Sequence, residues 1–471
     1  MSIPALEWMK RGDEANAEIR ANIGKNRLTG GDIVPTVESE RKMSPLAFAA
    51  TWAGMSIILT GFMLPAQMYP AMSGFSIFLA FVLGCIVCVV VLSLTGDMGI
   101  SYGIPFAVAI RTVFGTVGTH IPSIVRAFPA MFWYGFQTWL GAYAINQVIA
   151  GWTGFSNLWL WVILFAAVQV YTTAQGIRAI TWFERIATPV ILAIFVYMLF
   201  LAKSQFGVGL ISVLQTPGEG GMPFILGMNA VIGYWATMAL NIPDFTRSLK
   251  ANRYQENWWR RNVGSIWSQA SGLVITMTFV ALVGLVCAIA TGEWHPVDQI
   301  MLIGGGYGPR VVLVLIMIAL AQWTTNIGAN ILPPAFIFAN VGAPKVSFKI
   351  GCIIAGVIGL LLQPWNLANQ LVTVFAVISA LLGAVAGTMI CDYYILRRRK
   401  IDLKALYDPN GHYKYAKGFN PAAFIAFAVG CVLGMLWLDL SYFVSIISSL
   451  VVYFILMKVW ILKKYPQPEI L

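Results

Sequence analysis

The hydrophobic positions of this sequence fall into twelve long blocks separated by short polar segments. Each block has about 20 or more mainly apolar residues, the length that an α-helix needs to cross a bilayer. Residues 1–43 are polar and lack the pattern of a removable signal peptide. The sequence therefore predicts an all-α integral membrane protein with twelve transmembrane helices, at 46–70, 74–96, 121–150, 158–176, 184–203, 223–243, 264–290, 311–339, 347–366, 369–395, 421–438 and 441–462.

Basic residues lie almost entirely on one side of these predicted spans. If both termini share a face, every lysine and arginine of the 30 in the chain lies on that face except Lys203 and Arg310. Because basic loops are retained in the cytoplasm, we expect both termini there, in a multi-pass protein of the bacterial inner membrane. The predicted organisation is a cytoplasmic tail, a first repeat of helices 1–5, a second repeat of helices 6–10, helices 11 and 12, and a cytoplasmic C-terminal tail, at 1–43, 44–203, 204–400, 401–462 and 463–471.

Composition supports a membrane protein and argues against other classes. Hydrophobic residues make up 59% of the chain and charged residues 10%, with a mean hydropathy of +0.77. The net charge of +11 comes from short clusters between apolar blocks, which favours contact with anionic lipid over nucleic acid. The cysteines lie in or beside apolar blocks, and the histidines lack zinc-ligand spacing. No nucleophile–base pair, metal cluster or cofactor loop indicates an enzyme.

Two blocks carry residues that interrupt helices. The first contains Gly54 and Pro65, and the sixth contains Gly233 and Pro243. Interrupted segments in corresponding positions indicate the central site of a transporter, although membrane helices also use glycine simply for packing. Spans one and six correspond if the first ten spans form two repeats of five, and an odd number of spans makes the second copy inverted. We therefore expect a five-plus-five inverted-repeat core with broken helices 1 and 6.

Charged residues are missing from the middle of every predicted span. This absence argues against a carboxylate proton relay and against binding of a strongly charged solute. The basic run at 397–400 directly follows span ten. We interpret this run as a topology anchor, with lipid headgroup binding as the alternative.

Candidate chemistry begins in span three with Trp133 and Gln137. They are four residues apart, so on a helix they share one face and offer a flat indole beside a carboxamide. That pair suits a flat, neutral, hydrogen-bonding ring. The alternative is that Trp133 fills packing space and Gln137 bonds a neighbouring helix.

Span eight offers oxygen atoms without charge. Thr324 and Thr325 precede Asn326, and Asn330 follows one turn later. Sodium accepts neutral oxygens, and carbonyls freed at a broken helix can complete its shell with threonine hydroxyls. The alternative is that both hydroxyls bond carbonyls of their own helix.

Four segments resemble the nucleobase-cation-symport-1 family, and within it the sodium-hydantoin symporters. The likeness runs in order from about residue 44 to residue 462. The matching segments are FWYGFQTWLGA at 132–142, WTTNIGAN at 323–330, GLL with PW at 359–365, and DYY before RRR at 392–399.

This resemblance implies alternating access, two helices added after the inverted repeats, and a defined set of site residues. Trp133 and Trp235 would stack on opposite faces of the substrate ring, and Gln137 and Asn330 would bond its edges, with Asn326 supporting them. Sodium, the coupling ion, would be held between spans one and eight. Its ligands would be the carbonyls of Gly54, Ile57 and Ala321 and the hydroxyls of Thr324 and Thr325.

Two positions depart from the sodium-hydantoin symporters and concern the substrate. Ile58 replaces a glutamine of the broken first span, and Tyr234 replaces the glycine before the stacking tryptophan. Uracil, thymine, cytosine, allantoin or a simple hydantoin is therefore as credible a substrate as a bulky aryl-hydantoin.

The predicted function is a sodium-coupled symporter that imports a neutral heterocycle, acting as a monomer. The alternatives are a proton-coupled nucleobase permease or an amino-acid transporter of the same fold. A channel or a substrate-sensing receptor is a weaker rival, because neither charged pore rings nor a signalling domain is visible.

Overall fold

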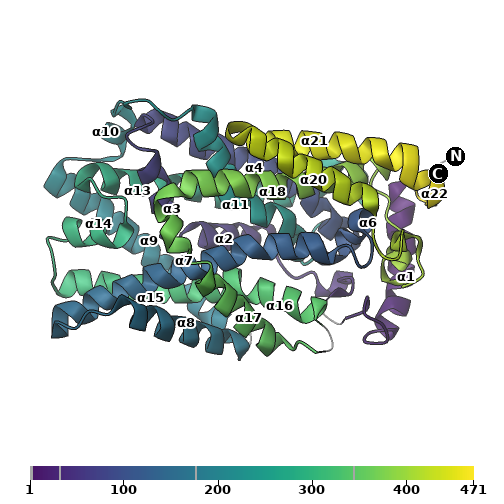
Figure 1. The fold of residues 1–471 in the computed structure, drawn as a ribbon, viewed down its shortest axis with the longest axis horizontal. Coiled ribbons are helices and arrows are strands. Elements are labelled where there is room, and N and C mark those ends of the chain that lie inside the picture. The colour runs from purple at the N-terminus through teal and green to yellow at the C-terminus, as the bar shows by residue number, and fades with distance from the viewer. Residues whose placement is uncertain (1–3, 31–32, 176–177, 343–344, 471) are drawn as a thin grey trace.

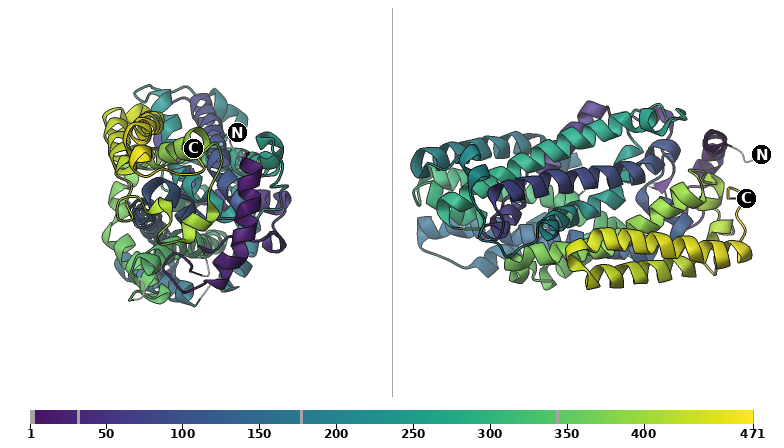
Figure 2. Two further views of the ribbon diagram at one scale, coloured as in Figure 1. Left: turned by 90° about the vertical axis from the view of Figure 1, so that its right-hand side faces the viewer. Right: turned by 90° about the horizontal axis from the view of Figure 1, so that it is seen from above.

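The computed structural model describes residues 4–30, 33–175, 178–342 and 345–470, and within them the chain is built from helices. Most helices run along the long axis of the molecule, and both termini lie at the same end (Figure 1). The first helix, α1 (Ala5–Ala21), lies across this end, which we call the termini end (Figure 2). Two termini at one end agree with an even number of spans.

The helices follow the predicted apolar blocks. The first five blocks form α2 (Pro45–Ser56) with α3 (Thr60–Met68), α4 (Gly74–Tyr102), α7 (His120–Thr153), α8 (Leu158–Ala174) and α9 (Arg178–Phe206). The next five form α11 (Phe224–Thr246), α12 (Trp258–Gln269) with η3 (Ala270–Ile275) and α13 (Thr276–Thr291), α15 (Pro309–Asn326) with η4 (Ile327–Ile331) and α16 (Leu332–Val341), α17 (Phe348–Leu361), and α18 (Leu371–Ile390) with η6 (Cys391–Leu396). The last two form α20 (Pro421–Leu436) and α21 (Ser441–Leu456), the latter continued by η9 (Met457–Ile461) and α22 (Leu462–Lys464).

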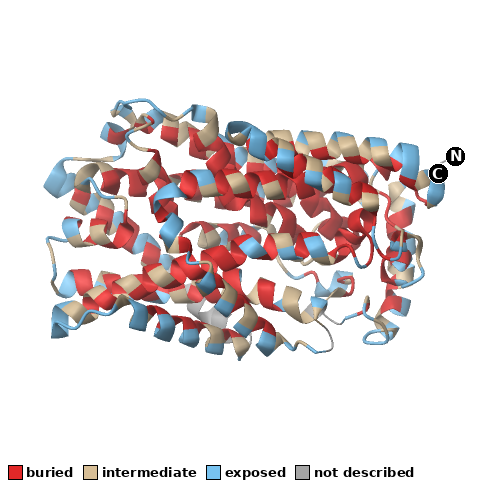
Figure 3. Cartoon of the chain, viewed as in Figure 1, coloured by how far each residue is buried: buried red, intermediate tan, exposed pale blue. Residues whose placement is uncertain are grey.

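Short helices make up most of the connections. They are η2 (Glu38–Glu40), α5 (Phe106–Ala109), α6 (Arg111–Phe114), α10 (Leu210–Gln215), α14 (Pro296–Ile303), η5 (Pro364–Gln370), α19 (Leu403–Tyr407), η7 (His412–Lys414) and η8 (Leu438–Leu440). Buried residues concentrate where helices face one another, and exposed residues lie mainly on the outer faces and at the two ends (Figure 3).

Many of the helices can cross a bilayer. Within the described residues, seven are long and apolar enough to do so, or eight if the bent pair α2 and α3 counts as one span. The shorter apolar helices α8, α17 and α20, together with the 34-residue α7, occupy the other predicted blocks. The fold is that of a multi-pass membrane protein, and the exact number of twelve spans stays a prediction.

The predicted break in span one is confirmed. Helices α2 and α3 meet at 60° across residues 57–59. Both halves pack on span seven at glycines, because a Cβ on Gly272 would lie 2.4 Å from the Ala49 carbonyl and one on Gly284 would lie 2.5 Å from the Phe62 Cα. The glycines of span seven thus allow the two halves of span one to approach closely.

The predicted break in span six is wrong for this structure. Helix α11 runs without interruption from Phe224 to Thr246. Gly233 serves packing instead, because a Cβ at this position would lie 2.0 Å from the Phe375 carbonyl of α18. Pro243 cannot donate to the Ala239 carbonyl one turn earlier, and that carbonyl instead accepts a 2.6 Å hydrogen bond from the Thr95 hydroxyl of α4. The glycine therefore brings two helices together and does not interrupt one.

The helices of the first ten blocks form two groups. The first group contains spans one, two, six and seven, in which α4 packs on α11, α2 on α12 and α3 on α13. The second group contains spans three, four, eight and nine, in which α7 packs on α8, α15, α16 and α17. Spans five and ten, α9 and α18, contact both groups, and α20 and α21 pack beside α18.

A buried carboxylate joins three elements near the termini end. Asp97 of α4 accepts two 2.8 Å hydrogen bonds from the Arg261 guanidinium, one of 2.8 Å from Asn262 and one of 3.0 Å from the Tyr393 hydroxyl. Asp97 is fully buried. Since charge taken out of water must be compensated by such bonds, this network ties α4 to α12 and η6.

Lipid headgroup binding, the alternative for the basic run at 397–400, is wrong for Arg397, and the role of the run as a topology anchor stays a prediction. The Arg397 side chain is fully buried, bonds Asp392 at 2.6 Å and the Thr112 carbonyl at 3.2 Å, and pairs with Glu469. Burial raises the pKa of the Glu469 carboxyl, but the charges and hydrogen bonds of Arg397 and His412 lower that pKa by more. The result is a pKa of about 2, below the ordinary value for a glutamate. Arg397 is thus a buried residue that connects distant segments of the chain. The sequence alone could not indicate Glu469 as its partner, because the two residues are 72 positions apart.

We predict that Asp97→Asn destabilises the protein, because it leaves the Arg261 guanidinium buried without its counter-charge. Breaking a buried pair costs about 3–5 kcal/mol, so the melting temperature in detergent should fall clearly. The control is Lys404→Gln, which removes the exposed Lys404–Glu18 pair of 2.8 Å and should barely change the melting temperature. Equal melting of both variants with the native protein would contradict this role for Asp97.

Candidate functional site

Helix α7 places Trp133 and Gln137 inside the protein. Trp133 is 8% exposed, and its indole lies 5.2 Å between ring centroids from Phe375 of α18, with 26° between the planes. Gln137 is 4% exposed, and its Oε1 has no hydrogen-bond partner among the described residues. A buried acceptor without a donor costs free energy, so this oxygen is suited to a ligand N–H.

Tyr234 of α11 contacts both predicted stacking residues. Its ring centroid lies 4.9 Å from that of Trp133 and 5.4 Å from that of Trp235. Its hydroxyl shares a 2.8 Å hydrogen bond with the hydroxyl of Thr60, the first residue of α3. The phenol therefore contacts both indoles and is tied to the residue that follows the break in span one.

Trp235 is buried on the same helix, and its indole N–H has no partner among the described residues. Its ring centroid lies 5.8 Å from that of Trp52 of α2. Since indole N–H groups normally find an acceptor when buried, the Trp235 N–H is a further group that a ligand could satisfy.

Asn326 directly precedes the π-helical turn η4, Asn330 lies within that turn, and both are buried. Asn326 Nδ2 donates to the Tyr134 carbonyl of α7 at 3.0 Å and to Gln169 of α8 at 2.6 Å. Asn330 Nδ2 donates to Asn326 Oδ1 at 2.8 Å. These bonds join spans three, four and eight within the second group.

Ile58 lies half-buried in the break of span one, beside the predicted sodium-binding carbonyls. In a continuous helix its amide would serve the Gly54 carbonyl, but here it donates to Ser56 at 3.0 Å. Likewise the Gly61 amide, which would serve Ile57, donates to Ile58 at 3.1 Å. The break therefore diverts both amides and leaves the Gly54 and Ile57 carbonyls without their helical donors.

Thr324 and Thr325 both turn toward the Ala321 carbonyl of their own helix. The Thr324 hydroxyl donates to it at 3.1 Å, and the Thr325 hydroxyl donates to the same oxygen. Three neutral oxygens are thus gathered on α15. The hydrogen bonds of the described residues do not link these oxygens to those in the break of span one.

Sequence reasoning missed Phe375, Thr60, Gln169 and the Tyr134 carbonyl. The first two belong to spans ten and one, and each meets its partner across more than a hundred residues of chain. Only the general rule that a buried amide needs a partner could have indicated a residue such as Gln169, without saying which one.

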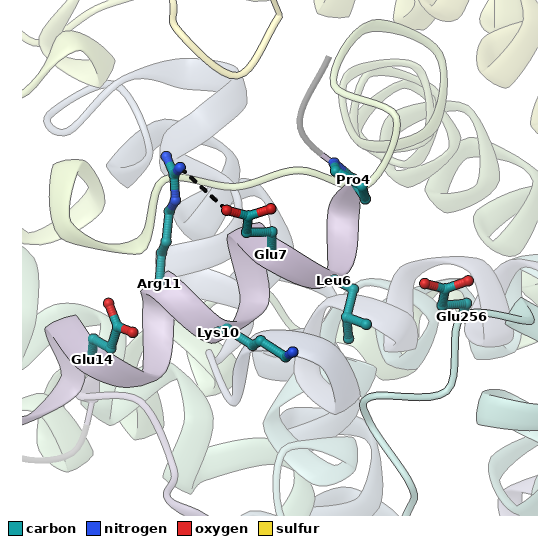
Figure 4. Close-up of a pocket in the computed structure, with 7 residues that line it drawn as sticks. All are labelled: Pro4, Leu6, Glu7, Lys10, Arg11, Glu14 and Glu256. Atoms are coloured by element: carbon teal, nitrogen blue, oxygen red, sulfur yellow. Dashed lines mark ion pairs between the residues drawn. The ribbon is translucent and has the colours of Figure 1, made fainter. Parts of the chain in front are cut away.

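A hollow of about 460 Å³ lies elsewhere, between α1 and Glu256 at the termini end (Figure 4). It is lined mostly by charged side chains, including Lys10 and the Glu7–Arg11 pair. None of the predicted site residues lines it, so it does not correspond to the predicted substrate site. No group of three or more potential metal-ligating side chains occurs within the described ranges.

Comparison with known proteins places the chain among membrane permeases. A family model described as permeases for cytosine/purines, uracil, thiamine and allantoin matches residues 34–461. The chain is 35% identical over 436 residues to the hydantoin permease of Microbacterium maritypicum, covering 92% of this chain and 89% of that protein. It is 31% identical over 473 residues to the allantoin permease of Bacillus subtilis, covering 92% and 94% respectively.

Solved structures agree with these relatives. The inward-facing conformation of Mhp1 superposes with a TM-score of 0.87 at 35% identity, covering 93% of this chain and 95% of that one. Mhp1 in a closed conformation with bromovinylhydantoin bound gives 0.85 at 34% identity, covering 94% and 98%. The chain therefore belongs to the nucleobase-cation-symport-1 family and is a membrane transporter of the nucleobase type.

Proposed function

We propose that this chain is a sodium-coupled symporter that imports a neutral planar heterocycle, such as a hydantoin, allantoin or uracil, by alternating access. The observation that carries the proposal is the placement of the aromatic residues. Trp133 belongs to the second helix group and Trp235 to the first, and the Tyr234 ring contacts both. A ligand bound there touches both helix groups. Relative motion of the two groups therefore exposes the ligand to one side of the membrane or to the other.

The chemistry of the site supports a flat, uncharged ring. The indoles offer apolar faces, and Gln137 and Asn330 offer carboxamides without any charged group beside them. A buried amide left unpaired costs about 1–3 kcal/mol, so rings lacking matching edge groups are rejected. Hydantoin and allantoin, which the names of the two relatives carry, both provide N–H and C=O groups.

The oxygens of spans one and eight are of the neutral kind that sodium accepts. The carbonyls of Gly54 and Ile57 have lost their helical donors, and the Ala321 carbonyl lies with two threonine hydroxyls. A hydroxyl that donates its proton keeps its lone pairs, so Thr324 and Thr325 can still face a cation. A sodium ion between them would join the two helix groups and favour the arrangement that binds substrate, and the substrate would strengthen sodium binding by the same factor.

The grouping of helices supports two repeats, at 44–203 and 204–400. Spans one and two lie with six and seven, three and four lie with eight and nine, and spans five and ten each contact both groups. Two equivalent repeats of five helices produce this correspondence, and the odd number inverts the second. We place the termini end, with its basic loops, in the cytoplasm of a bacterial cell.

Exchanging external sodium for choline at fixed pH should abolish uptake of the transported ring into proteoliposomes. Thr325→Val should raise the sodium concentration for half-maximal uptake about tenfold, because one neutral ligand is lost. The control is Thr51→Val. Thr51 lies in span one and is partly exposed, and its hydroxyl also donates to a carbonyl of its own helix, at 2.9 Å. Uptake that persists in choline but collapses with a protonophore would show proton coupling instead.

Gln137→Ala should reduce uptake by about 10- to 100-fold while the amount of protein in the membrane stays constant, because a ligand N–H loses its acceptor. The matched control is Gln299→Ala in α14, another buried glutamine whose Oε1 has no partner in the described part of the chain. Gln299→Ala should leave the KM for substrate unchanged. Unchanged uptake by Gln137→Ala would mean that the site lies elsewhere.

Tyr234 should limit the size of the ring, because its phenol packs against both indoles that are proposed to stack on the substrate. Tyr234→Ala should allow a hydantoin with a benzyl group at C5 to compete for uptake about tenfold better than it does in the native protein. Tyr234→Phe keeps the ring and should still exclude this compound. Strong competition by benzylhydantoin in the native protein would refute the size limit.

A further inference from the structure

Helix α14 lies at the end of the molecule opposite to the termini end, which we call the far end (Figure 1). It belongs to the connection between α13 of the first helix group and α15 of the second. It contacts α3, the outer half of span one, and also α7, which is span three. A side chain that fastens α14 to α7 therefore joins the far ends of the two helix groups.

The residue directly before α14, His295, has such a side chain. It is 5% exposed, and its ring centroid lies 4.7 Å from that of Tyr143 and 5.1 Å from that of Trp139. A third ring, that of Trp294, lies 5.6 Å away. The imidazole is nearly perpendicular to all three rings, with angles between 78° and 81°. Tyr143 and Trp139 belong to α7, so the imidazole bridges the start of α14 and span three.

A carboxylate lies beside the imidazole. His295 Nδ1 lies 3.3 Å from Asp298 Oδ2, which is the distance of an ion pair. Asp298 Oδ1 accepts a 3.1 Å hydrogen bond from the Tyr143 hydroxyl. Burial raises the pKa of the Asp298 carboxyl, but His295 and Tyr143 lower that pKa by more, to below the ordinary value for an aspartate. The carboxylate therefore stays charged in neutral and mildly acidic solution.

The surroundings of His295 suit a cation better than a neutral ring. Neither nitrogen of the ring makes a hydrogen bond to the described residues. A neutral imidazole has one N–H donor, and burying that donor without an acceptor costs free energy. A protonated imidazole is attracted to the aromatic rings, all within the roughly 6 Å over which cations and ring faces interact, and to the carboxylate. Protonation therefore strengthens the contacts of His295 with α7 and with Asp298.

Other charged groups around α14 do not replace Asp298 as the counter-charge. Glu293 is exposed, and the neighbouring helices α3 and α13 carry no charged side chain. Arg310 of α15 and Tyr197 of α9 line a separate hollow at the other end of α14. The positive end of the α14 dipole opposes a cation at His295, and Asp298 in the first turn offsets this effect.

A series of ring contacts connects this cluster to the predicted substrate residues. The centroid of Trp139 lies 5.6 Å from that of Phe136, and the centroid of Phe136 lies 6.0 Å from that of Trp133. These residues follow one another along α7, which runs from the termini end to the far end (Figure 1). The His295 cluster therefore lies on the far-end side of Trp133.

We propose that His295 is a proton-binding site, whose protonation clamps α14 to span three and favours the arrangement of the transporter that is closed at the far end. The clamp goes beyond the proposed function, because it regulates access and does not bind the ring. It takes one element from that function: with the termini end in the cytoplasm, the far end faces the exterior. An acidic exterior should then slow the entry of substrate.

Hydrogen exchange of the full-length protein in detergent tests the clamp without any substrate. The exchange of the α14 amides is compared between the native protein and His295→Gln at about pH 5.5 and about pH 7.5, on either side of the range in which histidines usually titrate. Comparing both proteins at one pH cancels the effect of pH on the chemical exchange rate. At the lower pH these amides should exchange about three- to tenfold faster in the variant, which lacks the cation. At the higher pH the difference should be less than about twofold.

Uptake into proteoliposomes tests the consequence for transport. The internal pH and the sodium gradient stay constant while the external pH is lowered from about 7.5 to about 5.5. The KM for external hydantoin or allantoin should rise about three- to tenfold in the native protein and stay constant in His295→Gln. An unchanged native KM would overturn the proposal. Stimulation of native uptake by external acid, the result expected of proton-coupled transport, would overturn it as well.

The matched control is His120→Gln, at the start of α7, which should keep the native pH dependence in both experiments. Asp298→Asn keeps the imidazole but removes its counter-charge, so it should lose most of the pH dependence and serves if His295→Gln does not fold. A ratio of exchange rates that is the same at both pH values would show that His295 only fills space, and would overturn the proposal. If neither ring is taken up, the proposed substrates are wrong, and the exchange experiment still decides the clamp.

Discussion

A backbone that leaves its helix inside a membrane must find partners for its polar groups within the protein, and this constraint governs the rest of the molecule. The break between α2 and α3 is enclosed by its own group of helices, with Ile57 and Leu59 almost fully buried. Span seven approaches both halves through glycines, and the Tyr234 hydroxyl bonds Thr60 just beyond the break. The irregular segment is thus held by span six on one side and span seven on another.

Much of the fold could be predicted because it follows from hydropathy along single helices. The apolar blocks became helices, and span one breaks as predicted, at residues 57–59 between Gly54 and Pro65. The roles of Gly233 and Arg397 could not be predicted in this way. Whether a glycine breaks a helix or receives a neighbour depends on what packs against it, and here the Phe375 carbonyl does. Whether an arginine faces lipid headgroups or the interior depends on a carboxylate far along the chain.

In the candidate site, too, the residues could be predicted from the sequence, but their contacts with other spans could not. Trp133, Gln137, Trp235, Asn326 and Asn330 came from spacing and from likeness to a family, and the structure buries all of them. The phenol of Tyr234 was recognised as a change in the pocket, but its bond to Thr60 and its contact with Phe375 arise only when spans one, six and ten come together. The direction in which each amide points is likewise a property of the network, because an isolated asparagine has no preferred end.

The burial of Glu469 has a consequence for the order in which the protein is made. This carboxylate lies against Arg397, which also bonds the Thr112 carbonyl in the connection between spans two and three. The ribosome delivers Glu469 only after all the spans have been synthesised, since chains emerge from the N-terminus onward. Until then the Arg397 guanidinium lacks one of its two carboxylate partners. The termini end of the bundle is therefore completed last, after insertion of the helices that it joins.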